Sequence, residues 1–358
     1  MKKIQMARPI AMILALVVLL GAFTACSGPN LSGISGDELR TYVAMQSKNF
    51  KIKGSMFAYF FHEVGGAYVS SITQEELDER GYDDSKSLKE QYYDEDTTWY
   101  DYILEYVTKE VEMLLIMCEA ATAEGITLNN EDYNYVNEQM TAQRTRVVVH
   151  FETDYNTYLT NQYNGYVNES DVIEIMLMET LAAKYEAHLH QRIEERMTQE
   201  RLDSQIATMT GEKDETITRN LGHVLASYMQ YDESQAYENC KTAKTRLLDA
   251  GKTEEAFEKI WSEFSDDANM IYENLSQGEM IGEIDQWLYA EERAVGDVGI
   301  VESENGCHLL FYISEGDPAY VAKAKVELEE IVAEELREEL RKEYKIKTKK
   351  NVLYAIDI

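Results

Sequence analysis

The chain has 358 residues, with 66 Asp and Glu against 34 Lys and Arg, and a formal net charge of -32 at pH 7. This length is enough for two domains. The acidic balance argues against nucleic acid as a partner, because nucleic-acid binding needs a basic surface, and against a chain that lies flat on anionic lipid. It suits a solvated protein or one that handles basic clients, and solubility alone explains it equally well.

The start of the chain is typical of an export signal. Three basic residues precede the uncharged apolar run Ile10–Ala22, which is short for a transmembrane helix and suits the core of a signal peptide. The residues that follow, ending in Cys26, resemble a lipobox, although Phe23 replaces the usual Leu. We expect a signal peptide over 1–25, lipid on Cys26 and a flexible tether over 26–35. An ordinary signal peptide with a chance cysteine is the alternative.

The cysteines do not form the pattern of a disulfide framework. Besides Cys26 the chain has three, Cys118, Cys240 and Cys307. This number is odd and the spacing is wide, so we expect free thiols or at most one bridge despite the exported context. No second segment is long and apolar enough to span a membrane, and the nearest candidate, 111–123, is interrupted by two glutamates.

Residues 36–212 are predicted to be mostly helical. The clearest helix is Asp101–Glu124, where apolar residues recur at spacings of three and four and form one stripe. Gly125 is placed to end this helix, and Asn129 or the asparagine after it can cap the next. Two further helices are expected, over 168–190 and 197–209. Tyrosine is dense between residues 92 and 166, and it serves adaptable binding surfaces as well as helix packing.

The pattern changes at Thr218. A strand is predicted over 219–226, followed by helices over 235–250, 254–264 and 284–294. Val298–Val301 and His308–Ile313 are predicted strands, because the Asn-Gly between them is a strong hairpin signal. Strand, helix, helix, helix, strand, strand indicates an α+β unit of about 100 residues. A long charged helix is expected over 321–344.

Four segments of this second unit carry a family resemblance. They are Gly222-His223-Val224-Leu225, Phe264-Ser265-Asp266-Asp267, the segment Gly278–Ile284, and Gly306-Cys307-His308-Leu309-Leu310. In this order they resemble the parvulin-type peptidyl-prolyl isomerase domain, which has a histidine on its opening strand, an acidic or thiol residue, a glycine-containing segment beside a proline pocket, and a second histidine on its closing strand. The departures are a longer loop over 268–277, Ile284 in place of an aromatic residue, and a curtailed helix after it.

The resemblance implies a site and its chemistry. His223, Asp267 and His308 are the implied catalytic residues, with the two histidines as a hydrogen-bonded pair on neighbouring strands. The proline pocket would be formed by three apolar residues, Ile281, Ile284 and Trp287. Isomerisation needs no cofactor and no metal, and none is expected. Strand alternation puts Cys307 on the face opposite His308, so packing is the better interpretation of this cysteine.

The whole order of segments resembles the extracytoplasmic foldase lipoproteins. We expect an α+β chain with a helical chaperone-like domain over 36–212, an inserted parvulin-like domain with a small antiparallel sheet over 218–317, and a C-terminal helix over 319–358 that packs with the N-terminal domain. The expected function is a membrane-anchored foldase that binds unfolded secreted proteins and isomerises X-Pro bonds. The alternatives are a chaperone whose parvulin-like domain has weak or no activity, and a structural or solute-binding lipoprotein.

Overall fold

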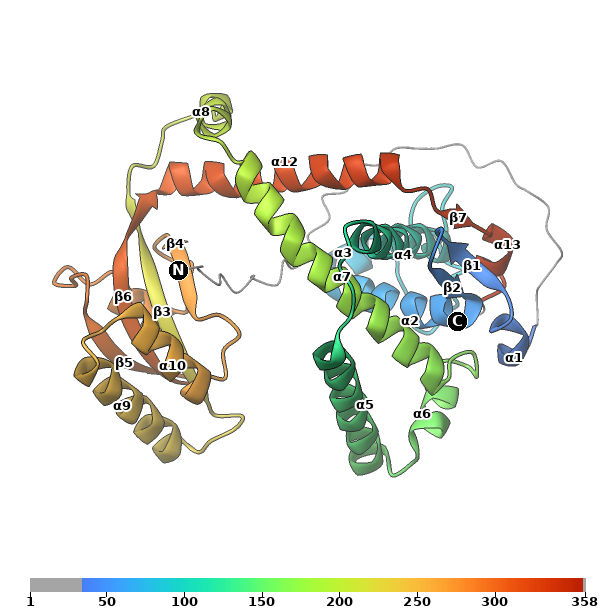
Figure 1. Cartoon of the computed structure of the whole chain (residues 1–358), viewed down its shortest axis with the longest axis horizontal. Helices are drawn as coiled ribbons and strands as arrows, with labels where there is room; N and C mark the ends of the chain where they lie inside the picture. Colours follow the sequence, from blue (N-terminus) through green and yellow to red (C-terminus); the bar gives the residue numbers. More distant parts are fainter. Residues whose placement is uncertain (1–33, 357–358) are drawn as a thin grey trace. The chain divides into compact units, whose positions relative to one another are not determined.

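A computed structural model describes residues 34–356 (Figure 1). The predicted signal peptide, Cys26 and most of the tether lie outside the described residues. The described chain packs as two compact units, one formed by residues 194–333 and the other by 34–193 together with 334–356. Helices and two small antiparallel sheets confirm the predicted α+β class. No described helix combines the length and the apolar character needed to cross a membrane.

The unit formed by 34–193 and 334–356 is mostly helical. The apolar stripe of α4 is buried as predicted. Its first turn is capped by the Thr98 side chain, which accepts from the Asp101 backbone N–H, and the Asn129 side chain caps α5 in the same way. The helices of this unit are α1 Gly36–Leu39, α2 Gly54–Ser71, α3 Gln74–Glu79, α4 Trp99–Ala123, α5 Asn130–Phe151, α6 Tyr155–Gln162, α7 Glu169–Arg196 and α13 Lys350–Leu353.

A three-stranded sheet that the sequence did not predict ties the chain end into this unit. Its order is β2 (Lys51–Lys53), β1 (Val43–Gln46), β7 (Lys347–Thr348), and both pairings are antiparallel. The buried Tyr100 hydroxyl also donates to the carbonyl of Ile356 at 2.8 Å. The last residues therefore pack on α2 and β1. The domain boundaries given by the sequence differ from those of the compact units and stay predictions.

The unit formed by residues 194–333 contains a four-stranded antiparallel sheet of order β4-β3-β6-β5. Its strands are β3 Ile217–Ser227, β4 Ile271–Leu275, β5 Val298–Ser303 and β6 Gly306–Pro318. The helices are α8 Gln199–Thr208, α9 Glu233–Asp249, α10 Glu254–Phe264, α11 Gly282–Leu288 and the first part of α12 Ala319–Glu343.

Three local predictions in this unit were wrong. The segment 268–277, expected to be a loop, contains the edge strand β4, which pairs with β3. The helix α9 begins at Glu233, two residues before the expected start at 235, because the Asp232 side chain accepts from the Gln235 backbone N–H and caps the helix. The helix α11 ends at Leu288, six residues before the expected end at 294.

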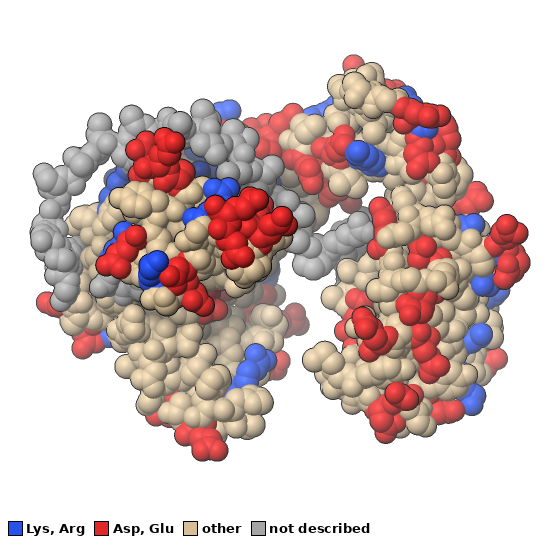
Figure 2. All heavy atoms as spheres, turned by 180° about the vertical axis from the view of Figure 1, so that it is seen from behind, with Lys and Arg blue, Asp and Glu red and all other residues tan. Residues whose placement is uncertain are grey.

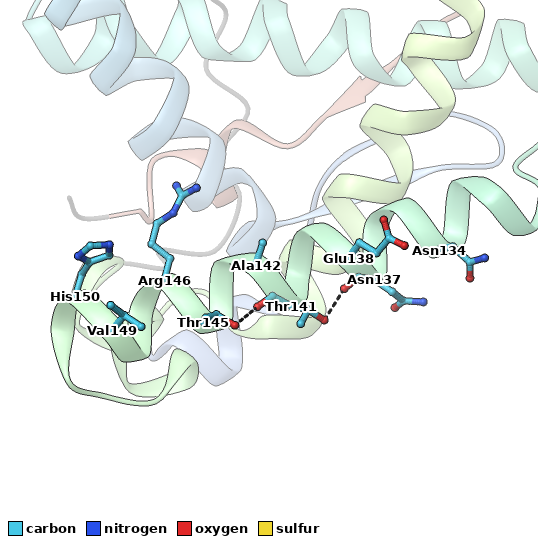
Figure 3. Close-up of a pocket in the computed structure, with 9 residues that line it drawn as sticks. All are labelled: Asn134, Asn137, Glu138, Thr141, Ala142, Thr145, Arg146, Val149 and His150. Atoms are coloured by element: carbon cyan, nitrogen blue, oxygen red, sulfur yellow. Dashed lines mark hydrogen bonds between the residues drawn. The ribbon is translucent and has the colours of Figure 1, made fainter. Parts of the chain in front are cut away.

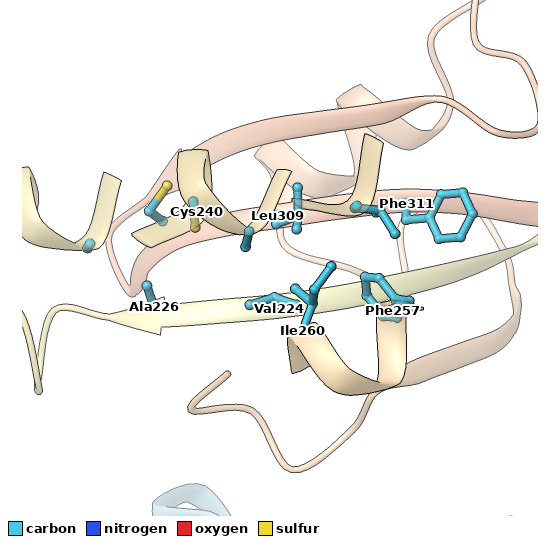
Figure 4. Packing of buried hydrophobic residues seen from close by; sticks show 11 residues of the cluster. Val224, Ala226, Cys240, Phe257, Ile260, Leu309 and Phe311 are labelled. Carbon is cyan, nitrogen blue, oxygen red and sulfur yellow. The ribbon is translucent and has the colours of Figure 1, made fainter. Parts of the chain in front are cut away.

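The sheet has an apolar core on each face. On one face α9 and α10 pack against alternate residues of β3 and β6, including Val224, Ala226 and Leu309 (Figure 4). On the other face α11 packs against the residues between them, including Leu221 and Leu310. Strand alternation thus divides the side chains of β3 and β6 between two different cores.

Acidic side chains are spread over both units on the face drawn in Figure 2. They are not gathered over a single element, which agrees with the formal net charge of -32. A surface of this kind keeps a protein solvated and attracts basic partners through long-range charge.

Candidate functional site

His223 of β3 and His308 of β6 form a pair on the sheet face that carries α11. In the antiparallel register, His223 lies opposite Leu310 and Leu225 lies opposite His308, so both imidazoles project from one face. The two rings stack at 5.1 Å between centroids, and His223 Nε2 is 2.8 Å from His308 Nδ1. Both side chains are buried, with 4% and 2% of their surface exposed.

Hydrogen bonds extend this pair in both directions. On one side, the Asp267 carboxylate lies 2.5 Å from His223 Nδ1, and the Tyr272 hydroxyl donates to the same carboxylate oxygen at 2.9 Å. On the other side, the Ser303 hydroxyl lies 2.7 Å from His308 Nε2. We call these five residues the histidine row. Its members come from all four strands and from the loop before β4.

The partners of the row fix a consistent set of donors. The ionised Asp267 carboxylate only accepts, so the hydrogen of His223 is assigned to Nδ1. His223 Nε2 then accepts from His308 Nδ1–H, and His308 Nε2 accepts from the Ser303 hydroxyl. Ser303 in turn accepts from the Asn305 backbone N–H at 3.1 Å. In this assignment every donor of the row meets an acceptor.

Burial and hydrogen bonds set the charge of the row. Burial, and then the neighbouring His223, lower the pKa of His308 to about 4, so its imidazole is uncharged at neutral pH. Burial alone would raise the pKa of Asp267. Hydrogen bonds from His223, the Asn269 backbone and Tyr272 outweigh it and hold that pKa below its usual range. The row thus presents one fixed carboxylate beside an uncharged imidazole.

The loop after α10 is held against the end of β3, which places Asp267. The Ser265 hydroxyl accepts from the backbone N–H groups of Leu225 and Asp267, at 3.2 and 3.1 Å. The backbone N–H of Asp266 donates to the Leu225 carbonyl at 2.8 Å, and its carboxylate accepts from the Ser227 backbone at 2.9 Å. These bonds pair the Ser-Asp-Asp segment with the strand and fix the direction of its third side chain.

The structure brings His223, Asp267 and His308 together, but it does not bring the three predicted pocket residues together on one open surface. Ile284 is 1% exposed and packs within the α11 core, whereas Ile281 is 37% exposed. Trp287 is half-buried, and a Cβ atom on Gly299 would lie only 2.2 Å from its ring nitrogen. The catalytic and substrate-binding roles of all six residues stay predictions.

Two members of the row were not found from the sequence. Ser303 directly precedes the hairpin turn at 304–305, and its register opposite Gly306 puts it on the same face as His308, so strand alternation could have found it. Tyr272 lies in β4, within the segment expected to be a loop, and no local signal indicated it. Within residues 34–356, no group of three or more His, Cys, Asp or Glu side chains could hold a metal ion.

Neither of two surface hollows in the described part of the chain is lined by a member of the row. The larger, of about 750 Å³, runs along one side of α5 (Figure 3) and is lined by Asn134, Asn137, Glu138, Thr141, Ala142, Thr145, Arg146, Val149 and His150. A smaller one, of about 480 Å³, lies over 228–234 at the start of α9. Half-buried apolar residues, including Met280, Trp287 and Val301, pack against the apolar core that α11 forms on the same face of the sheet.

The fold and the histidine row define the class of this domain: an α+β unit with paired histidines on one face of an antiparallel sheet. No family model matches the chain, and no curated protein matches it. Among solved structures, the chain is similar to parvulin-type foldases and SurA-like chaperones.

Three of these solved structures show the extent of the likeness. The peptidylprolyl isomerase PrsA from Bacillus anthracis is 18% identical, with 65% of this chain and 95% of that chain covered and a TM-score of 0.23. PrsA from Bacillus subtilis is 17% identical, covering 73% and 86%, with a TM-score of 0.34. A SurA-like chaperone structure from Campylobacter jejuni is 11% identical, covering 86% and 99%, with a TM-score of 0.24. At these identities and TM-scores a shared function does not follow.

Proposed function

We propose that this chain is an extracytoplasmic foldase whose α+β unit, residues 218–317, catalyses cis–trans isomerisation of X-Pro bonds. The observation that carries the proposal is the histidine row, in which Asp267, His223 and His308 are linked at 2.5 and 2.8 Å on one sheet face. These are the three residues that the parvulin resemblance implies. The lipobox supports a lipid anchor on Cys26, and unfolded secreted proteins are the proposed clients.

The reaction requires differential stabilisation and no covalent step. Amide resonance sets a rotation barrier of about 18–20 kcal/mol, and uncatalysed X-Pro isomerisation takes about tens to hundreds of seconds. An enzyme lowers this barrier by binding the twisted amide better than either planar form. The groups that do so act best when they are already fixed, because they then do not reorganise during the rotation.

The row is built to fix one charged group at the edge of the apolar surface. Three hydrogen-bond donors hold the Asp267 carboxylate, and its side chain keeps 15% of its surface exposed. The two imidazoles behind it are buried. His223 contacts the carboxylate, and His308, held by Ser303, contacts His223, so the chain of hydrogen bonds fixes the orientation of the carboxylate. We therefore assign Asp267 the electrostatic contact with the rotating amide, and His223 and His308 the positioning of that carboxylate.

The proposed client-binding surface in the helical unit is the solvent-exposed surface of α5. Large apolar residues with 48–65% of their surface exposed stand on this helix: Tyr133, Tyr135, Val148, Val149 and Phe151. Val149 also lines the hollow of Figure 3. Exposed apolar side chains of this density mark interaction surfaces, and unfolded polypeptides offer the apolar partners.

A specific observation favours the alternative of a chaperone with weak or no isomerase activity. The two histidines are 4% and 2% exposed, and Ile284 is 1% exposed. A substrate proline would thus have no direct contact with the two imidazoles or with Ile284. This burial supports client binding without efficient catalysis as the second candidate function.

A prolyl-isomerase assay on the purified full chain tests the proposal. We expect the chain to accelerate cis–trans exchange in an X-Pro peptide. His308→Ala should lower kcat/KM at least tenfold, because His223 then loses its hydrogen bond to His308 and is no longer linked to Ser303. His188→Ala, which removes an exposed imidazole of the helical unit, is the matched control and should keep the wild-type rate. No acceleration by the wild-type chain would overturn the isomerase proposal, and suppression of client aggregation would then support the chaperone alternative.

A further inference from the structure

Two cysteine thiols meet in the core behind the histidine row. Cys240 of α9 and Cys307 of β6 are both fully buried, among the apolar residues that α9 and α10 pack against the sheet (Figure 4). Cys307 directly precedes His308 but projects from the opposite face of β6. Both side chains belong to this one buried cluster, and each thiol is the largest influence on the pKa of the other, so the two side chains are neighbours before any oxidation.

The third described cysteine has a different environment. Cys118 of α4 lies in the helical unit, and its thiol donates to the Met178 backbone carbonyl at 3.4 Å. It is buried and has no thiol partner in the part of the chain that the structure describes. Contact between two thiols is thus a property of Cys240 and Cys307, and Cys118 is an internal control for any oxidation of this chain.

We propose that Cys240 and Cys307 form a disulfide that joins α9 to β6 as the chain folds in an oxidising compartment. The oxidant is a disulfide, either of an oxidoreductase protein or of a small thiol such as glutathione. One cysteine thiolate attacks the oxidant's disulfide, forms a mixed disulfide and releases one thiolate. The second cysteine thiolate then attacks the bonded cysteine sulfur and releases the other. Two cysteine thiols are oxidised, the oxidant's disulfide is reduced, and the two protons go to its released thiols.

In the folded unit the two thiols shift each other's pKa in opposite directions. The hydrogen bond from Cys240, together with the His308 backbone N–H, lowers the pKa of Cys307. The same contact and burial raise the pKa of Cys240. Both side chains are inaccessible in the folded unit, so the exchange takes place before the core between α9 and the sheet closes.

The bridge has a measurable effect on stability because it closes a long loop. The segment 240–307 contains α10, β4, α11 and β5, and cross-linking its ends restricts the unfolded chain. For a loop of this length we expect the oxidised chain to melt about 10 °C above the reduced chain. This inference does not depend on isomerase activity, and it concerns the side of the sheet opposite the histidine row.

Oxidative refolding of the full chain tests the proposal without assuming its location in the cell. The chain is unfolded, refolded in a glutathione redox buffer, alkylated without reduction, digested and mapped by mass spectrometry. We expect a Cys240–Cys307 linked peptide and alkylated Cys118. Cys118→Ser should keep the link, and Cys307→Ser should abolish it. The melting difference between oxidised and dithiothreitol-treated chains should be present in the wild type and absent in the Cys240→Ser, Cys307→Ser double variant.

The wild-type peptide map decides the outcome even where a variant fails to fold. Alkylation of both Cys240 and Cys307 in the refolded, folded chain would overturn the proposal and leave them as a packed thiol pair. A link from either residue to Cys118 would overturn it as well.

Discussion

Acidification from pH 7 to pH 5 should destabilise the unit formed by residues 194–333 through His308. The pKa of His308 is lowered to about 4 in the folded chain, from a value of 6.5 for an unperturbed histidine. Below pH 6.5 this histidine is therefore protonated in the unfolded chain, whereas in the folded chain it is protonated only near pH 4. The stability that His308 contributes is complete above pH 6.5 and is lost as the pH falls from 6.5 toward 4.

The two pKa values fix the size of this effect. Their difference corresponds to at most about 3 kcal/mol of unfolding free energy. Integration of the proton linkage between pH 7 and pH 5 gives a loss of about 2 kcal/mol, because most of the titration of the unfolded histidine falls in this range. The 2% exposure of the side chain means that little solvent screening reduces this figure.

Urea unfolding at a series of pH values measures the effect. His308→Asn removes the titrating group, so this variant should lose about 2 kcal/mol less than the wild type between pH 7 and pH 5. Titration of the histidine ring signals by NMR gives the pKa of His308 directly. A value above 6, or equal acid sensitivity in the wild type and His308→Asn, would refute the reasoning.

Two further predictions concern packing and client binding. Gly299→Ala should lower the unfolding free energy by about 1–3 kcal/mol and shift the tryptophan fluorescence, because its Cβ would overlap the Trp287 ring. Gly282→Ala, whose Cβ meets no atom within 4 Å, is the control and should leave the fluorescence unchanged. An equal shift in both variants would contradict the contact. Val149→Ser should weaken suppression of client aggregation by the full chain, whereas Val326→Ser, equally a change of an exposed valine on a helix, should not; equal behaviour of the two would exclude α5 as the client surface.

Local signals predicted the elements whose stability is local. The helix α4 has the periodic apolar stripe that the sequence predicts, and α10 spans Glu254–Phe264, as expected from the sequence. The strands β1, β2 and β7 have only two to four residues each, and β7 pairs with β1 across about 300 positions of sequence. Pairing of this kind depends on where the chain end returns, which no short stretch of sequence records.

The site was predictable in its residues and less so in its geometry. His223, Asp267 and His308 stand in the segments that carry the family resemblance, and the structure places them within one row of hydrogen bonds. Tyr272 was missed because β4 is an edge strand with polar residues at two of its five positions. An edge strand needs neither continuous apolar character nor regular alternation, since only one of its sides pairs.

The position of α11 shows why apolar residue types alone do not define a binding surface. Ile284 and Leu288 are four residues apart, so they share one face of this helix and bury it against the sheet. Ile281, just before the helix, is left exposed, and Trp287 turns toward Gly299. The half-buried residues that pack against the α11 core, such as Met280 and Val301, are the proposed contacts for a proline ring. The isomerase and chaperone proposals therefore differ in one physical requirement. Catalysis needs the fixed Asp267 carboxylate and this half-buried surface to contact one substrate together, whereas client binding on α5 needs neither.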